Sequence, residues 1–164
     1  MGEVLSGVNF RKAKSAMVNP FDLRTIVLEK HAQHVVLIHF PIALFIIGVG
    51  FDVLSRGKRE SQFAGAAYLN VSVAAAFILP TLATGMLAWQ FALRGAKLEG
   101  LLLLHFVAAI LATLLIIVSW LLHWQARKSR TQFLPRYRIP IEVLGVVMIV
   151  VTAHFGGFLS GVNG

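Results

Sequence analysis

Residues 101–124, LLLLHFVAAILATLLIIVSWLLHW, decide the fold, because this run contains no Lys, Arg, Asp or Glu. A helix needs about 20 apolar residues to cross the hydrocarbon core of a bilayer, and the run is long enough to do so. Its two titratable side chains are His105 and His123. The run therefore predicts a membrane-spanning helix with one histidine near each end.

Three further apolar segments accompany this run, at about 35–54, 64–93 and 141–159. Pro41 and Pro80 lie inside the first two, where a proline is expected to bend the helix. Short connections between the segments favour antiparallel neighbours. We therefore expect an all-α fold, a four-span transmembrane up-down-up-down helix bundle that occupies residues 34–164.

Residues 1–33 form a separate N-terminal extension in this interpretation. Apolar and charged residues alternate through 20–33, PFDLRTIVLEKHAQ, and Pro20 suits the start of a helix. This pattern predicts a short amphipathic helix lying in the membrane interface. A plain soluble extension is the alternative.

The composition excludes several classes of protein. Hydrophobic residues make up 57% of the 164 residues and charged residues 13%, whereas a soluble domain has about 25% charged residues. Cysteine is absent, which removes disulfides, thiolate ligands and iron–sulfur clusters. The formal net charge of +8 belongs to connections that meet lipid headgroups, so we expect contact with lipid and no binding of nucleic acid.

The distribution of basic residues predicts an orientation. Side A is the side that holds both termini and the connection between the second and third spans, and side B is the opposite side. The side-B connections contain Arg56, Lys58, Arg59, Arg127, Lys128, Arg130, Arg136 and Arg138. Close to the membrane, side A has fewer basic residues, namely Arg24, Lys30, Arg94 and Lys97. The positive-inside rule then places side B in the cytoplasm and the termini in the periplasm of a bacterial inner membrane, although Arg11, Lys12 and Lys14 reduce the difference.

Three histidines on three different spans lie at a similar depth. His39, His105 and His154 are each expected about 6–8 Å below the side-A edge of the apolar zone. Histidine is costly in hydrocarbon and is the usual axial ligand of haem iron. Spans 1 and 3 face each other across the bundle, so His39 and His105 are the natural ligand pair, with His154 as a substitute ligand or a supporting group.

Cationic groups near this layer suit the propionates of a haem, since carboxylates pair with charged donors. They lie at or above the layer: His34, His31, Arg24, Lys30, Arg94 and Lys97. Two alternatives remain open for the histidines. They could form an interhelical polar network or proton relay without a cofactor, or they could bind zinc or copper.

The side-B half of the bundle contains fewer candidates. His123 lies between Trp120 and Trp124, which is the pattern of an anchor at the membrane interface. Asp52 and Glu142 lie near helix ends, where we expect them to reach water or to pair with Arg56 or the basic connection.

The stretches 34–44, HVVLIHFPIAL, 84–89, TGMLAW, and 154–159, HFGGFL, resemble a bacterial family of small four-helix membrane proteins known as domain of unknown function 2231. The resemblance covers roughly residues 34–164. Two positions depart from the family pattern: Val35 replaces a proline and Ser160 a tyrosine. The resemblance implies a membrane bundle with histidines at His34, His39, His105 and His154, and it is similar in plan to b-type cytochromes with four helices.

These observations predict a membrane-embedded electron-transfer subunit of a larger respiratory or photosynthetic complex, rather than an enzyme acting alone. We expect one haem b, with quinone as a further cofactor, and partners among other membrane-complex subunits, including a c-type cytochrome. The alternative is a non-redox structural or interaction subunit whose histidines bond helices together. A small transporter or proton channel would need a polar path to side B, and 106–120 and 143–151 offer almost none.

Overall fold

The computed structural model describes residues 30–56, 62–129 and 135–160. In this part of the chain four helices follow one another: α2 (Lys30–Ser55), α3 (Gln62–Phe91), α4 (Gly100–Lys128) and α5 (Arg138–Leu159). All four are long and apolar enough to cross a membrane. The predicted all-α fold with four spans is therefore confirmed.

The first helix begins earlier than the sequence predicted. We expected the span to start near residue 35, but α2 begins at Lys30, because a helix can continue past its apolar segment into the polar headgroup layer. Residues 30–33, which we assigned to the interfacial helix, are the first turn of α2. The rest of that helix, 20–29, lies outside the described residues.

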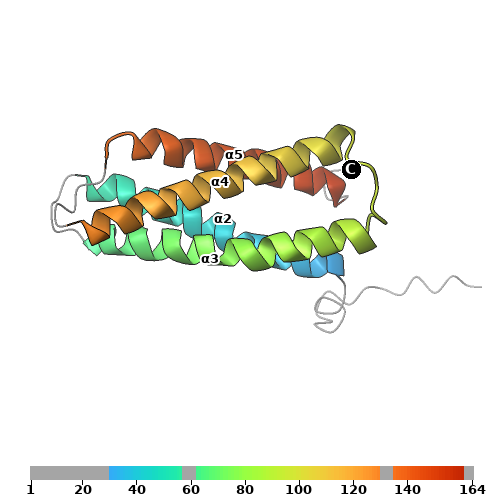
Figure 1. Cartoon of the computed structure of the whole chain (residues 1–164), viewed down its shortest axis with the longest axis horizontal. Coiled ribbons are helices and arrows are strands. Elements are labelled where there is room, and N and C mark those ends of the chain that lie inside the picture. The colour runs from blue at the N-terminus through green and yellow to red at the C-terminus, as the bar shows by residue number, and fades with distance from the viewer. Residues whose placement is uncertain (1–29, 57–61, 130–134, 161–164) are drawn as a thin grey trace, which may run out of the picture.

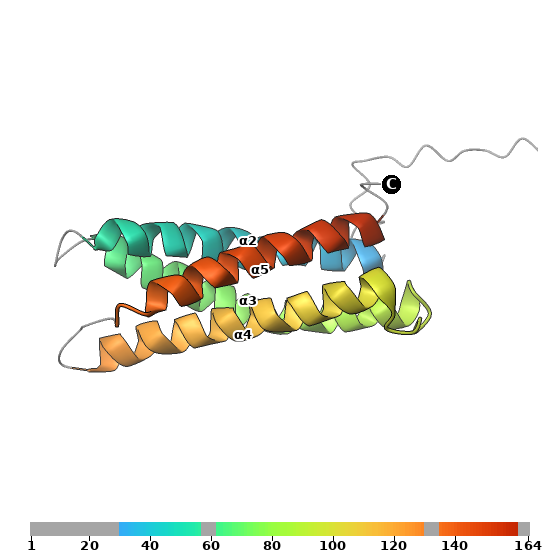
Figure 2. The same ribbon diagram turned by 90° about the horizontal axis from the view of Figure 1, so that it is seen from above.

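Consecutive helices run in opposite directions (Figure 1), so the start of α2, the α3–α4 connection and the end of α5 lie at one end, side A. The helices form a ring in which α3 packs on α2 and α4, while α5 packs on α4 and α2. The extensive contacts are within the pairs α2–α3 and α4–α5, and Figure 2 shows α4 and α5 side by side along their lengths. As a result, α2 and α4 face each other across the diagonal of the ring.

The hydrophobic core joins the two helix pairs in the middle of the bundle. Phe45 is fully buried, and its ring would lie 2.8 Å from a Cβ atom at Gly145, so only glycine lets α5 approach α2 this closely. The other buried members of the core come from all four helices: Val49, Val71, Ala74, Ile78, Ala112, Ile116 and Ile149. Apolar side chains elsewhere on the outside of the bundle are exposed in great number, as expected for a surface that contacts lipid.

Fewer of the described side chains are buried toward side A. The ribbons of the two helix pairs diverge in that direction (Figure 1). Among the described apolar residues, those that are buried near side A are mainly Ala88 and Ala108, each of which is 6% exposed. The connection that follows α3 is held by Trp89, whose Nε1–H donates to the carbonyl of Ala96 at 2.9 Å.

Candidate functional site

Two of the predicted histidines lie on the inward-facing stripes of diagonal helices. On α4, His105 shares one face with the buried residues Ala108, Ala112 and Ile116, because residues three or four apart lie above one another on a helix. On α2, His34 lies seven residues before the buried Pro41, which corresponds to two helical turns. Both imidazoles are partly buried.

His34 and His105 also lie at the same level of the bundle. The core contact of Gly145 with Phe45 and Leu115 defines a common reference level for α2 and α4. At 1.5 Å per residue, His34 lies about 17 Å from this level toward side A, and His105 lies about 15 Å from it. The two imidazoles therefore occupy matched positions on helices that face each other across the bundle.

Each of the two rings forms a hydrogen bond through Nδ1 to a neighbouring helix. The Nδ1–H of His105 donates to the backbone carbonyl of Thr152 at 3.0 Å. The hydroxyl of Thr84 lies within hydrogen-bond distance of the carbonyls of Pro80 and Thr81. When it donates to one of them, its oxygen can accept from Nδ1–H of His34 at 3.3 Å. A histidine whose Nδ1 carries the proton has its lone pair on Nε2, which is the arrangement found in metal-binding histidines.

A glycine on the paired helix makes room for each ring. A Cβ atom at Gly85 would lie 3.0 Å from Cε1 of His34. A Cβ atom at Gly156 would lie 3.2 Å from Cε1 of His105. Each histidine is thus positioned in the same way, by a neighbouring helix that supplies a glycine and a hydrogen-bond acceptor.

His39 and His154 lie away from these stripes. His39 comes two residues before Pro41, about 200° around the helix; it is exposed, and its Nδ1 donates to the carbonyl of Val35 on its own helix at 2.6 Å. His154 is also exposed and contacts Phe158 edge-on, with 4.9 Å between ring centroids. The sequence could not reveal which histidines lie on outward faces, because apolar residues occur on every face of these helices.

The structure describes some of the cationic groups that were predicted near side A. Arg94 and Lys97 lie in the connection between α3 and α4, and both are exposed. Arg24 lies outside the described residues. The positions of the Lys30 and His31 side chains are likewise outside the description. Two cationic side chains are therefore available on the side of the bundle where His34 and His105 lie.

The side-B half holds a buried polar cluster that the sequence analysis misjudged. Asp52 is fully buried and Arg138 is 8% exposed. Nε and Nη2 of Arg138 donate to the two carboxylate oxygens of Asp52 at 2.7 and 3.1 Å. This bidentate pair ties the end of α2 to the start of α5, and it confirms the expected pairing with the basic connection. The expectation that Asp52 reaches water is wrong.

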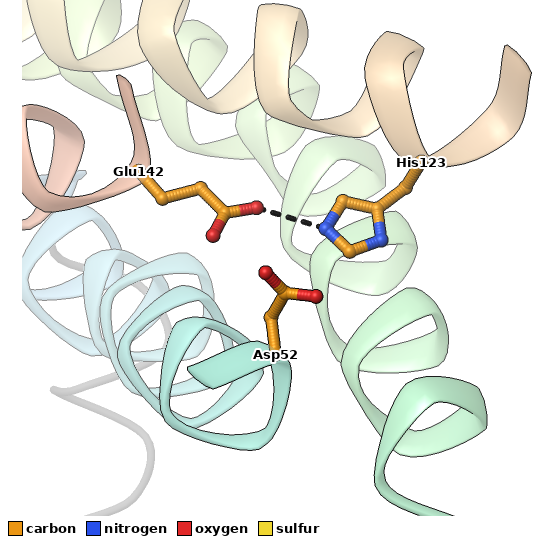
Figure 3. Close-up of side chains that lie close together, drawn as sticks. All are labelled: Asp52, His123 and Glu142. Atoms are coloured by element: carbon orange, nitrogen blue, oxygen red, sulfur yellow. Dashed lines mark hydrogen bonds and ion pairs between the residues drawn. The ribbon is translucent and has the colours of Figure 1, made fainter. Parts of the chain in front are cut away.

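Glu142 and His123 complete this cluster (Figure 3). Glu142 is fully buried and His123 is 3% exposed, with 2.8 Å between Glu142 Oε1 and His123 Nε2. The predictions of an interfacial anchor at His123 and of a water-exposed Glu142 are therefore wrong. His123 lies four residues after the buried Ser119, on the inward stripe of α4. The sequence places these two residues on one helical face, but it does not show that this face turns inward.

Comparison with known proteins supports the membrane assignment. A family model described as "Predicted membrane protein (DUF2231)" matches residues 30–164. No curated protein and no solved structure matches the chain.

Proposed function

This chain belongs to the DUF2231 family of membrane proteins, and from that premise we propose that it is an electron-transfer subunit that binds one b-type haem through His34 and His105. The observation that carries the proposal is the matched level of these two histidines on the inward stripes of diagonal helices. A haem with two histidine ligands needs imidazoles that approach iron from opposite sides. In this proposal His34 takes the place that the sequence analysis gave to His39.

The surroundings of each histidine support this role. Thr84 and the carbonyl of Thr152 hold the Nδ1 atoms, and such bonds orient an imidazole toward a metal and increase its basicity. Gly85 and Gly156 allow the rings to pack close to the neighbouring helices. Arg94 and Lys97 supply cations at the end of the bundle where the propionates would emerge. When bound, the haem supplies one-electron redox chemistry.

The proposed partners follow from the composition of the fold. The described residues are taken up almost wholly by four membrane helices, so electrons must come from and go to partner molecules. We propose other subunits of a respiratory or photosynthetic complex as these partners, with a c-type cytochrome or a quinone on side A. Side A is the periplasmic side of a bacterial inner membrane in this proposal, because the side-B connections are the more basic.

The test is the visible absorption spectrum of the full-length protein, purified in a mild detergent. We expect a Soret band that shifts on addition of dithionite, and we expect His105→Gln to abolish it. His154→Gln is the matched control, since it removes an exposed imidazole from a similar depth and should leave the band unchanged. A colourless wild-type protein that stays colourless after incubation with haemin would contradict the proposal.

A second candidate function is favoured by the same hydrogen bonds. His34 with Thr84 joins α2 to α3, and His105 with Thr152 joins α4 to α5. In a non-redox structural subunit these bonds would stabilise the bundle by about 0.6–2 kcal/mol each. This candidate predicts that His34→Gln and His105→Gln lower the stability of a colourless protein, whereas the haem proposal predicts loss of a chromophore.

A further inference from the structure

We propose that Asp52, His123 and Glu142 form a second site, which binds a divalent first-row transition-metal cation in the side-B half of the bundle. This site is distinct from the histidine pair near side A. Its three residues come from α2, α4 and α5, so a cation held there would join both helix pairs. The inference does not depend on the haem proposal.

The geometry of the cluster suits a single cation. Each of the three side chains offers one ligand atom, and these atoms all lie within 4.8 Å of one another. Figure 3 shows the two carboxylates and the imidazole turned toward one another. It is the only group of three or more potential ligands that meets this criterion in the described part of the chain. A cation bound between the three side chains could contact all of them after small movements.

An unsatisfied oxygen gives independent support for a bound cation. Glu142 is fully buried, and its Oε2 has no hydrogen-bond partner among the described residues, although its Oε1 is bonded to His123. A buried carboxylate oxygen without a partner is costly. An ion pair that served only to join helices would be expected to satisfy both oxygens. A cation bound by Oε2 would remove this cost.

The charges of the cluster favour an added cation. Two carboxylates lie close together within the site, and like charges at such a distance repel each other strongly in a medium of low dielectric constant. Arg138 offsets one of them through its bidentate contact with Asp52. This contact also holds the carboxylate in place, and an ionised carboxylate retains further lone pairs for a metal. Arg138 is thus a positioning residue for Asp52.

The donor atoms indicate which cations fit. One imidazole nitrogen and two carboxylates suit zinc, manganese and iron in their divalent states, whereas magnesium and calcium prefer oxygen ligands alone. The hydrogen bond between His123 Nε2 and Glu142 Oε1 must open, because Nε2 needs its lone pair for the metal. Binding therefore exchanges the proton between these two atoms for the cation, and the proton is released to the solvent.

Zinc and manganese are the probes for this proposal. Full-length protein in detergent is incubated with ZnCl2, dialysed, and analysed for zinc by mass spectrometry. We expect stoichiometric zinc in the wild type and in the control His154→Gln, and only traces in Glu142→Gln. The Glu142→Gln variant keeps the side-chain volume and the hydrogen-bond partner for His123. Only traces of zinc in the wild type, or equal zinc in wild type and Glu142→Gln, would overturn the proposal.

Two measurements on the wild type do not depend on the folding of a variant. X-ray absorption at the zinc edge should show one imidazole together with oxygen ligands. A zinc shell with two or more imidazoles would assign the metal to other histidines and overturn the proposal. Addition of MnCl2 should give the electron paramagnetic resonance signal of immobilised manganese, and the signal of hydrated manganese alone would contradict the site.

Discussion

Removal of the Asp52–Arg138 pair should show how strongly the buried cluster joins the helices. Asp52→Asn replaces a carboxylate that accepts two hydrogen bonds, at 2.7 and 3.1 Å, from a guanidinium that is 8% exposed. A charge-assisted hydrogen bond contributes about 1.5–3 kcal/mol. Removing one partner of a buried pair costs about 3–5 kcal/mol. Because asparagine can still accept one of these bonds, we expect a loss of about 3 kcal/mol.

The assay is a double-mutant cycle. The free energy of unfolding is measured by circular dichroism in dodecyl maltoside, with increasing mole fractions of dodecyl sulfate, for the wild type, Asp52→Asn, Arg138→Gln and the double variant. The double variant contains no uncompensated charge at this pair, so it should be more stable than the sum of the single effects predicts. Arg56→Gln is the control, because Arg56 is exposed on the same side, and it should change stability by less than about 0.5 kcal/mol. Additive single effects, or an Asp52→Asn variant as stable as the control, would refute this reasoning.

Two further predictions concern close contacts of glycines. Gly145→Ala places a Cβ atom 2.8 Å from the ring of the fully buried Phe45, so we expect the same unfolding assay to show a loss of about 1–3 kcal/mol. Gly50→Ala, where the added atom meets no described residue within 4 Å, should instead increase stability by up to about 1 kcal/mol. Equal effects at the two positions would contradict the contact between Gly145 and Phe45. Gly156→Ala places a Cβ atom 3.2 Å from His105, so it should shift the Soret band or weaken haem retention; an unchanged spectrum and haem content would show that this glycine does not position the ring.

The sequence was sufficient to predict the spans but not the directions of their side chains. A run such as 101–124 must be a membrane helix, because no other structure of that length satisfies its backbone in lipid. The side that each helix turns inward is harder to predict, since lipid and protein interior are equally apolar. The sequence therefore favours His39 over His34, whereas the buried stripe of α2 shows that His39 lies on the outward face.

The buried cluster is the opposite case, because polar residues that the sequence places at the membrane surface are buried in the structure. Asp52, His123 and Glu142 each lie close to a helix end, and a charged group there ordinarily reaches water. Their burial depends on the meeting of α2, α4 and α5, which is a property of the assembled bundle. The spacing of His123 from Ser119 and of Glu142 from Arg138 puts each pair on one helical face. That spacing was readable, but its inward direction was not.

In the proposed haem site His34, rather than His39, is the partner of His105. The most direct measurement compares the reduced-minus-oxidised spectra of His34→Gln and His39→Gln, both purified with haemin present. Both variants replace an imidazole on α2 by an amide. They differ mainly in whether the replaced side chain lies on the inward face or the exposed face of the helix. We predict that His34→Gln loses the Soret and α bands while His39→Gln retains them. Loss of the bands in His39→Gln together with their retention in His34→Gln would contradict the assignment.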